Sequence, residues 1–225
     1  FISILVTALG IILSVLLTTT MGYVVSRNTY KLKSFYTWVI FIPMIFNGGM
    51  LAGYVVNTNI LHLRNSIWAL ILPLAVSPFN IVICKTFFKT TIPDSIVESA
   101  KIDGAGHTKI FFQITFPLGK PILVTMGLFS ALAYWNDWTN GLYYLSGNQG
   151  QKLYSIQNLL NQMITDIQYL ASGKVAGNIG AEVAKLPTTS IRMAIAFIAM
   201  LPLFIIYPFL QKYFAEGITL GAVKG

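Results

Sequence analysis

Aromatic and polar residues meet at one place in an otherwise apolar run: Trp135, Asn136, Asp137 and Trp138. Aromatic rings pack on the C–H faces of sugars, and Asn and Asp side chains exchange hydrogen bonds with hydroxyl groups. A carboxylate inside a membrane segment is costly and usually faces a protein interior or an aqueous cavity. Binding pockets combine apolar walls with a few placed polar groups in this way. The cluster therefore indicates a sugar-binding surface or, with equal weight, an interfacial aromatic belt with Asp137 near the outer surface.

Two further polar residues in apolar runs, Asn47 and Asn80, are weaker candidates for lining an aqueous pathway. Polar side chains within spans often only hydrogen-bond between helices, and this interpretation is favoured for each of them.

No catalytic or metal-binding constellation is recognisable. The HExxH and GxSxG patterns are absent, and His62 and His107 fall in different predicted loops. Cys84 is the only cysteine, so neither an intrachain disulfide nor a thiolate cluster is expected. The stretch 104–109 superficially resembles a phosphate-binding loop, but GxxxxGK[ST] does not occur. We therefore expect no enzymatic activity and no cofactor or metal in this chain.

Composition predicts a membrane protein. Of the 225 residues, 55% are hydrophobic and 10% are charged, with a mean hydropathy of +0.69. Soluble domains carry about 25% charged residues. The net charge of +8 comes without a basic cluster or an aromatic RNA-binding motif, so a nucleic-acid partner is not expected. We expect a single transmembrane domain over residues 1–225 within a lipid bilayer.

Five apolar runs are candidate transmembrane helices. Gly10 and Gly22 in the first run either allow close helix packing or are ordinary spacers. Pro43 and residues 47–49 predict a kinked or unwound second run, through packing alone or because it lines a cavity. Pro73 and Pro78 interrupt the third. The runs are residues 1–26, 36–56, 66–84, 122–145 and 191–210.

Basic residues predict the orientation. Residues 27–33, residues 85–120 and the C-terminal tail together hold ten of the fifteen Lys and Arg residues, so we expect them in the cytosol. Residues 57–65 and the long polar segment 146–190 are then external, and residues 154–164 could form a short surface helix. An external Phe1 and a cytosolic end require an odd number of spans. We expect a further span to precede Phe1.

A polar island, residues 93–121, separates the third and fourth runs. Pro93 and Asp94 suit the start of a helix, and Gly104 can close its end. A second short helix should follow Gly106 and stop at Pro117. Such an island presents two rigid helical pieces to a partner outside the membrane.

The spacing within the island resembles the EAA motif of permease subunits of bacterial ATP-binding cassette importers, written E-A-A, three residues, G, nine residues, I-x-L-P. Every element has its counterpart here, in Glu98, Ser99, Ala100, Gly104, Ile114 and Pro117. Asp103, Gly104 and Ala105 also fit the variant common in sugar permeases. Ser99 and Phe116 are mild departures. The unspecific alternative is an amphipathic interfacial helix.

Other stretches are similar to maltose-type carbohydrate importers, in particular the subgroup for complex oligosaccharides: residues 46–49, 68–73, 135–138 and 221–225. The resemblance implies an all-α permease that moves oligosaccharides by alternating access. It also implies a second permease subunit, a cytosolic ATPase dimer that binds the ATP, and an extracellular substrate-binding protein. The island would then dock on the ATPase. Ile96, Val97 and Ala100 provide an apolar face either for docking or for packing on the permease, and Glu98 and Asp103 are polar anchors for basic groups on either partner.

Alternatives are an importer permease for a non-sugar solute such as amino acids, and a secondary transporter. A secondary transporter does not need the island, and no internal repeat supports it.

Overall fold

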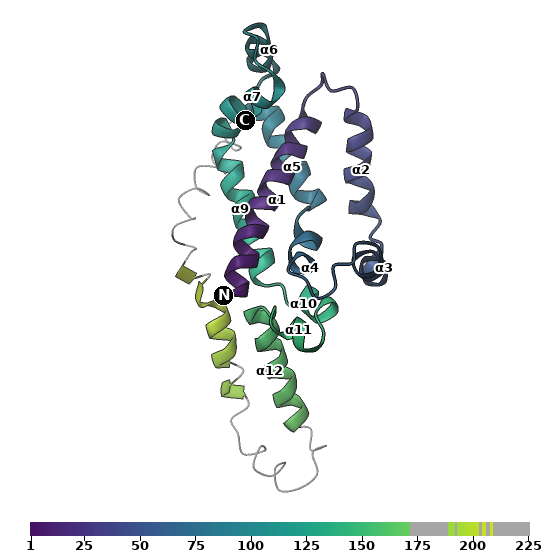
Figure 1. Ribbon diagram of the computed structural model, residues 1–225. Helices are drawn as coiled ribbons and strands as arrows, with labels where there is room; N and C mark the ends of the chain where they lie inside the picture. The colour runs from purple at the N-terminus through teal and green to yellow at the C-terminus, as the bar shows by residue number, and fades with distance from the viewer. Residues whose placement is uncertain (172–188, 192, 203, 206–207, 209–225) are drawn as a thin grey trace.

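Helices make up the described part of the chain. The structure, a computed structural model, describes residues 1–171, 189–191, 193–202, 204–205 and 208, and every regular element among them is helical (Figure 1). Helix α1 (Ile2–Ser26) lies between α5 (Pro78–Thr91) and α9 (Lys120–Trp135), and α2 (Lys33–Ile45) stands at the edge of this bundle. The all-α prediction is confirmed.

Helix α1 packs closely on both neighbours. A Cβ added at Gly22 would lie 2.6 Å from the Cβ of Cys84 in α5, and one added at Gly10 would meet the ring of Tyr134 in α9. The Ser130 hydroxyl of α9 donates to the Ser14 hydroxyl of α1 over 2.9 Å. Small residues let helix backbones approach in this way. The close-packing prediction for both glycines is confirmed, and α1, α5 and α9 form one tight unit.

Length and hydropathy make α1, with 25 residues, the single described helix that could cross a membrane unaided. Two bent pairs could each make one span: Trp68–Leu74 with Pro78–Thr91, bent by 50°, and His107–Leu118 with Lys120–Trp135, bent by 82°. The structure thus confirms the first predicted span and changes the limits of the next three.

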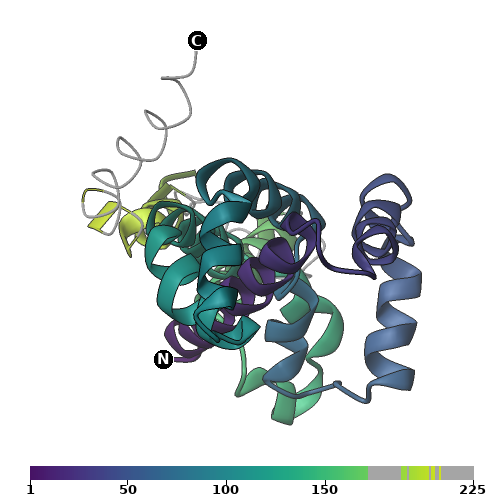
Figure 2. The same cartoon turned by 90° about the horizontal axis from the view of Figure 1, so that it is seen from above.

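The second predicted span, residues 36–56, is not one helix. Helix α2 ends at Ile45, and α3 (Gly49–Val55) runs across its direction, as Figures 1 and 2 show together. The Asn47 side-chain oxygen accepts from the Gly49 N–H over 2.9 Å, and Gly49 has a φ of 77°. That left-handed backbone suits glycine and begins α3, whereas α2 ends where Phe46 adopts an extended backbone. Pro43 lies inside α2, and a π-helical turn, η1 (Val56–Ile60), follows α3.

The third predicted span, residues 66–84, is broken and ends later. It consists of α4 (Trp68–Ile71), the 3-10 turn η2 (Leu72–Leu74) and α5, which begins at Pro78. Proline is favoured in a first helical turn, where its missing N–H is not needed. Helix α5 continues to Thr91, shortly before Pro93, so Lys85 and Lys89 are helical residues rather than part of the following loop.

The fourth predicted span, residues 122–145, ends early, because α9 stops at Trp135 and α10 (Thr139–Tyr144) starts anew. Helices α11 (Gly147–Gln151) and α12 (Ile156–Ala171) follow within the predicted external segment. The surface helix expected at 154–164 is present as α12 and is longer than predicted. The fifth predicted span coincides in part with an apolar helix, Thr189–Pro202. Residues 172–188 and the tail 209–225 lie outside the described residues.

Candidate functional site

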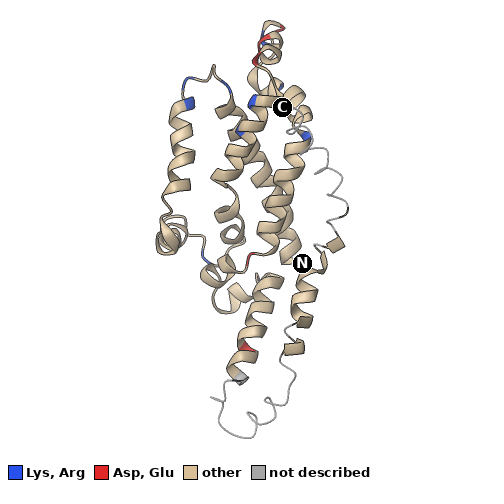
Figure 3. Ribbon diagram, turned by 180° about the vertical axis from the view of Figure 1, so that it is seen from behind, with Lys and Arg blue, Asp and Glu red and all other residues tan. Residues whose placement is uncertain are grey.

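The polar island forms a compact unit at one end of the bundle. Helix α6 (Asp94–Ile102) and the short α7 (His107–Ile110) extend beyond the ends of α5 and α1 (Figure 1). Asp94 in the first turn of α6 and Lys101 in its last turn match the helix dipole. Glu98, Ser99 and Asp103 are exposed. Basic side chains gather at this same end (Figure 3).

The apolar residues of α6 divide into two sets. Val97 and Ala100 are 4% and 9% exposed and belong to one buried cluster with Tyr23 and Phe111. Ile96 and Ile102 are 39% and 86% exposed. Of the two roles predicted for this apolar face, Val97 and Ala100 have the second, packing on the permease itself, while Ile96 and Ile102 are exposed.

Gly104 ends α6 in a left-handed conformation with φ of 79°. Its N–H bonds to the Lys101 carbonyl over 3.0 Å, and the Ala105 N–H bonds to the Ala100 carbonyl over 2.9 Å. These two bonds define a Schellman motif, which satisfies carbonyls at a helix end. Nothing lies within 4 Å of a Cβ added at Gly104, so backbone conformation and not space requires glycine.

The second half of the island bends back into the bundle. Chain residues 107–118 continue through α7, the π-helical turn η3 (Phe111–Thr115) and α8 (Phe116–Leu118). Ala105 and the motif residue Ile114 pack against the buried cluster of Tyr23 and Phe111. The stop predicted at Pro117 comes one residue early: the helical stretch ends at Leu118.

The bend itself falls at Gly119. A Cβ there would lie 2.9 Å from both the Phe88 ring and the Thr115 carbonyl oxygen. Only glycine fits this close approach without displacement.

Sequence reasoning missed the role of Arg27, which it counted only as a positive charge. Arg27 is 5% exposed. One guanidinium nitrogen donates to the Ile92 carbonyl over 3.0 Å and to Asp94 over 3.1 Å, and the other donates to the Phe88 carbonyl over 2.6 Å. The sequence did contain a hint of this role, because Arg27 is the first charged residue after an uncharged stretch of 26 residues.

The residues of the Trp135–Trp138 cluster are placed at a helix break. The Trp135 indole N–H donates to the Ala199 carbonyl over 3.0 Å. Both Asp137 carboxylate oxygens accept hydrogen bonds, from the Thr139 and Asn140 N–H groups at 3.1 and 3.2 Å and from the Asn140 amide at 2.9 Å. Asp137 therefore caps α10. Asn136 and Trp138 are exposed and remain accessible to a ligand.

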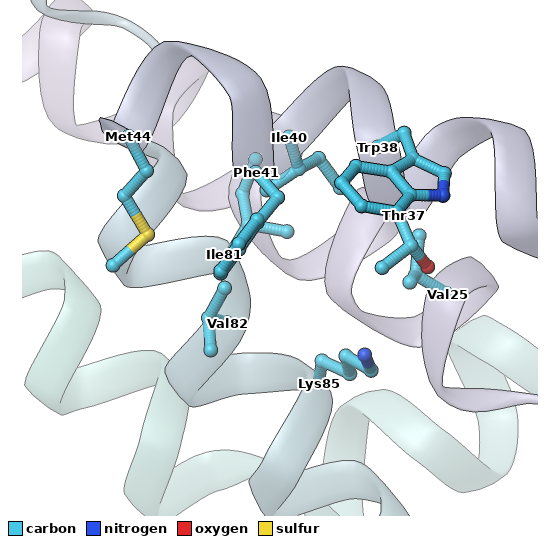
Figure 4. A pocket seen from close by; sticks show the side chains of 9 residues that line it. All are labelled: Val25, Thr37, Trp38, Ile40, Phe41, Met44, Ile81, Val82 and Lys85. Carbon is cyan, nitrogen blue, oxygen red and sulfur yellow. The ribbon is translucent and has the colours of Figure 1, made fainter. Parts of the chain in front are cut away.

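Asn47 does not join this cluster. It is exposed between α2 and α3, at the opposite edge of the bundle from α9 (Figure 1). A groove of about 280 Å³ lies on the nearby surface between α2, α5 and the end of α1 (Figure 4). Apart from Thr37 and Lys85, its lining is aliphatic, aromatic or Met, so the groove offers little for sugar hydroxyls.

The family described as "Binding-protein-dependent transport system inner membrane component" matches residues 4–220. The chain belongs to this family. It is a permease subunit of a bacterial ATP-binding cassette importer and an integral protein of the cell membrane, and such permeases work with an ATPase and a substrate-binding protein.

Individual relatives agree with this membership. The permease is 38% identical over 226 residues to "Polygalacturonan/rhamnogalacturonan transport system permease protein YtcP" of Bacillus subtilis (strain 168), covering 100% of this chain and 76% of that protein. It is 37% identical over 226 residues to "Protein LplC" of the same organism, covering 100% and 73%. A third relative there, "Melibiose/raffinose/stachyose import permease protein MelC", is 38% identical over 151 residues, covering 67% and 47%.

A solved structure has the same fold. The permease matches a chain in "Crystal structure of a bacterial ABC transporter involved in the import of the acidic polysaccharide alginate" with a TM-score of 0.77 and 25% identity, over 95% of this chain and 73% of that one.

Proposed function

We propose that this permease imports oligosaccharides by alternating access, in a heterodimer with a second permease subunit. A cytosolic ATPase dimer and an extracellular substrate-binding protein complete the assembly. The observation that carries the cargo assignment is that YtcP, MelC and the solved alginate transporter are all named for saccharides. The permease catalyses no reaction itself and holds no cofactor, since its partner ATPase binds the ATP.

The coupling surface of this proposal is α6 with its closing turn. Glu98, Ser99 and Asp103 offer exposed polar groups, and Ile96 and Ile102 offer exposed apolar ones. The other motif residues have structural roles. Gly104 ends α6, and the remaining ones hold α6 on the bundle and shape the return of the chain to α9: Ala100, Ala105, Ile114 and Pro117. A groove in the ATPase receives the exposed face.

The proposed orientation puts α6 in the cytosol. Arg27, Lys101 and Lys109 lie at that end together with Lys85 and Lys89 of α5, and basic residues are retained on the cytosolic side of a membrane. Residues 27–33 are then cytosolic, as are the stretch from the end of α5 to residue 120 and the C-terminal tail.

The opposite end then faces the substrate-binding protein. Segment 146–190, with α11 and α12, supplies this contact. At the base of α12 the buried Asn158 amide donates to the Trp138 carbonyl over 2.6 Å, which fastens the segment to the Trp135–Trp138 cluster. Asn136 and Trp138 are the accessible sugar-contacting residues of that cluster, with Trp135 and Asp137 holding its shape. Asn47 lies apart from this cluster in the single chain, and the second permease subunit would have to bridge the two for Asn47 to line the same pathway.

The decisive experiment measures uptake of a labelled panel in cells with and without this gene. The panel contains neutral oligosaccharides of increasing length, oligosaccharides of uronic acids, monosaccharides and amino acids. Selective loss of one oligosaccharide class supports the proposal and names the cargo. Loss of amino-acid uptake with intact saccharide uptake overturns the sugar assignment.

A further inference from the structure

Three helices meet at one guanidinium group. Arg27 directly follows α1, the Phe88 and Ile92 carbonyls end α5, and Asp94 begins α6. The Arg27 Nε–H donates to the Ser26 hydroxyl over 3.0 Å, and the charge lies 5.4 Å from the centre of the Tyr23 ring. The side chain therefore contacts the end of one membrane helix, the end of another and the start of the island helix.

Arg27 adds a donor at the end of α5, where the last carbonyls of a helix have no intrahelical partner. The missing N–H group of Pro93 removes the donor that would otherwise face the Lys89 carbonyl. The Phe88 carbonyl already accepts from the Ile92 N–H over 3.2 Å, so Arg27 is its second donor. A cation at a helix C-terminus is also favoured by the helix dipole. Arginine presents several N–H groups in a rigid planar fork, whereas lysine offers one compact ammonium group. The guanidinium can therefore hold two carbonyls and a carboxylate at once.

Burial separates the two halves of this junction. The Arg27 side chain is 6% exposed, and that of Asp94 is 49% exposed. The carbonyl contacts lie within the protein, while the carboxylate is at the surface, on the helix that carries the proposed coupling face. Asn28 adds a weaker amide contact to the same carboxylate at 3.4 Å. The junction is thus anchored in the bundle and open toward α6.

The bundle side of the junction is stiff. Gly22 in the last turns of α1 lies against Cys84 of α5, and α9 is joined to α1 through Ser14 and Ser130. The other end of the island enters α9 through the bend at Gly119. Besides the apolar contact of Val97 and Ala100 with Tyr23, a displacement of α6 can therefore be transmitted to the bundle along the chain by two routes, one through the Gly119 bend and the other through residues 92–94.

We propose that Arg27 is the positioning residue that makes the second route rigid, so that movement of α6 on the ATPase is passed to α1 and α5. This inference rests on the proposed function. Without the Arg27 fork, no hydrogen bond from Arg27 fixes the angle between the end of α5 and the start of α6, so α6 can tilt while α5 stays in place. Hydrolysis then continues but drives less transport.

The test uses the full importer, with both permeases, the ATPase dimer and the binding protein, in proteoliposomes. Variants are Arg27→Ala, Arg27→Lys and Asp94→Asn, with Lys31→Ala as a matched control because Lys31 is an exposed cation of the same loop. Saccharide uptake and ATP hydrolysis are measured together, and subunit stoichiometry is checked by gel filtration. We expect Arg27→Ala to raise the ATP hydrolysed per saccharide about five- to tenfold. Asp94→Asn should raise this ratio less, because asparagine loses the charge but keeps an oxygen that can accept from the guanidinium. A variant that combines Arg27→Ala with Asp94→Asn should hydrolyse no more ATP per saccharide than Arg27→Ala alone, because both substitutions act on the same Arg27–Asp94 contact.

Arg27→Lys should lie between wild type and Arg27→Ala, because lysine keeps the charge but not the fork. An unchanged ratio of ATP to saccharide in a fully assembled Asp94→Asn importer overturns the inference, as does a parallel loss of uptake and hydrolysis in both Arg27 variants. If Arg27→Ala does not assemble, Asp94→Asn alone decides. Failure of the proposed function is distinguishable, because the wild-type importer then transports no saccharide at all.

Discussion

Gly22 of α1 lies against Cys84 of α5 so closely that an added Cβ would come within 2.6 Å of the cysteine Cβ and 3.2 Å of the Lys85 backbone nitrogen. No side chain can be accommodated there unless the two helices separate. We expect Gly22→Leu to destabilise the permease by about 1–3 kcal/mol, the usual effect of overpacking. Thermal unfolding of the purified protein in detergent measures this.

Gly127→Ala in α9 is the control for the Gly22 prediction, because a Cβ added at Gly127 would lie 3.9 Å from its nearest neighbour, a Val15 methyl group. Equal melting temperatures for the wild type and Gly22→Leu would show that α1 and α5 do not pack as described.

Gly104 should be required for its backbone conformation. An alanine at φ of 79° meets no neighbouring atom but carries a left-handed strain of about 1–2 kcal/mol. Gly104→Ala should therefore loosen the turn after α6, lowering saccharide uptake while basal ATP hydrolysis persists. Gly106→Ala is the matched control, because Gly106 has an ordinary φ of −69°. Similar uptake by the two variants would argue against a role for the left-handed turn.

Ile102 should contact the ATPase. It is 86% exposed at the end of α6, the helix that carries the proposed coupling surface. Ile102→Glu should reduce copurification of the ATPase with the permease severalfold, without a change in the melting temperature of the permease. Ile60→Glu serves as the control, since Ile60 is 66% exposed in η1, away from α6. Loss of the ATPase in both variants would mean that surface charge alone weakens assembly.

Asp137 should act as a helix cap rather than as a charged sugar ligand. Asparagine retains an oxygen that can accept from the Thr139 and Asn140 N–H groups, so Asp137→Asn should transport saccharide nearly as well as the wild type. Asp137→Ala removes the cap and should destabilise the protein by about 0.5–2 kcal/mol. Trp138→Ala should lower uptake without this loss of stability. Abolished uptake in a stable Asp137→Asn variant would instead assign the negative charge to the substrate.

The local pattern of the chain determined which segments are helical and which one we propose as the coupling element. In a lipid bilayer, an uncharged run of 26 residues pairs its backbone N–H and C=O groups internally by forming a helix, and α1 occupies this run. Asp94, Gly104 and the residues between them specify α6 through a helix start, an amphipathic face and a glycine stop. Helix starts and stops of this kind depend on neighbours in sequence, so they can be predicted without the fold.

Tertiary structure decided where the spans break and what the polar groups contact. Hydropathy could not tell that α9 stops at Trp135, close to where the Trp135 indole N–H donates to the distant Ala199 carbonyl. It could not tell that Val97 faces the chain's own core while Ile102 faces outward, since both are simply apolar. The Arg27 fork joins residues 61 to 67 positions apart. Such contacts exist only once α1 and α5 are packed side by side, so no spacing rule in the sequence encodes them.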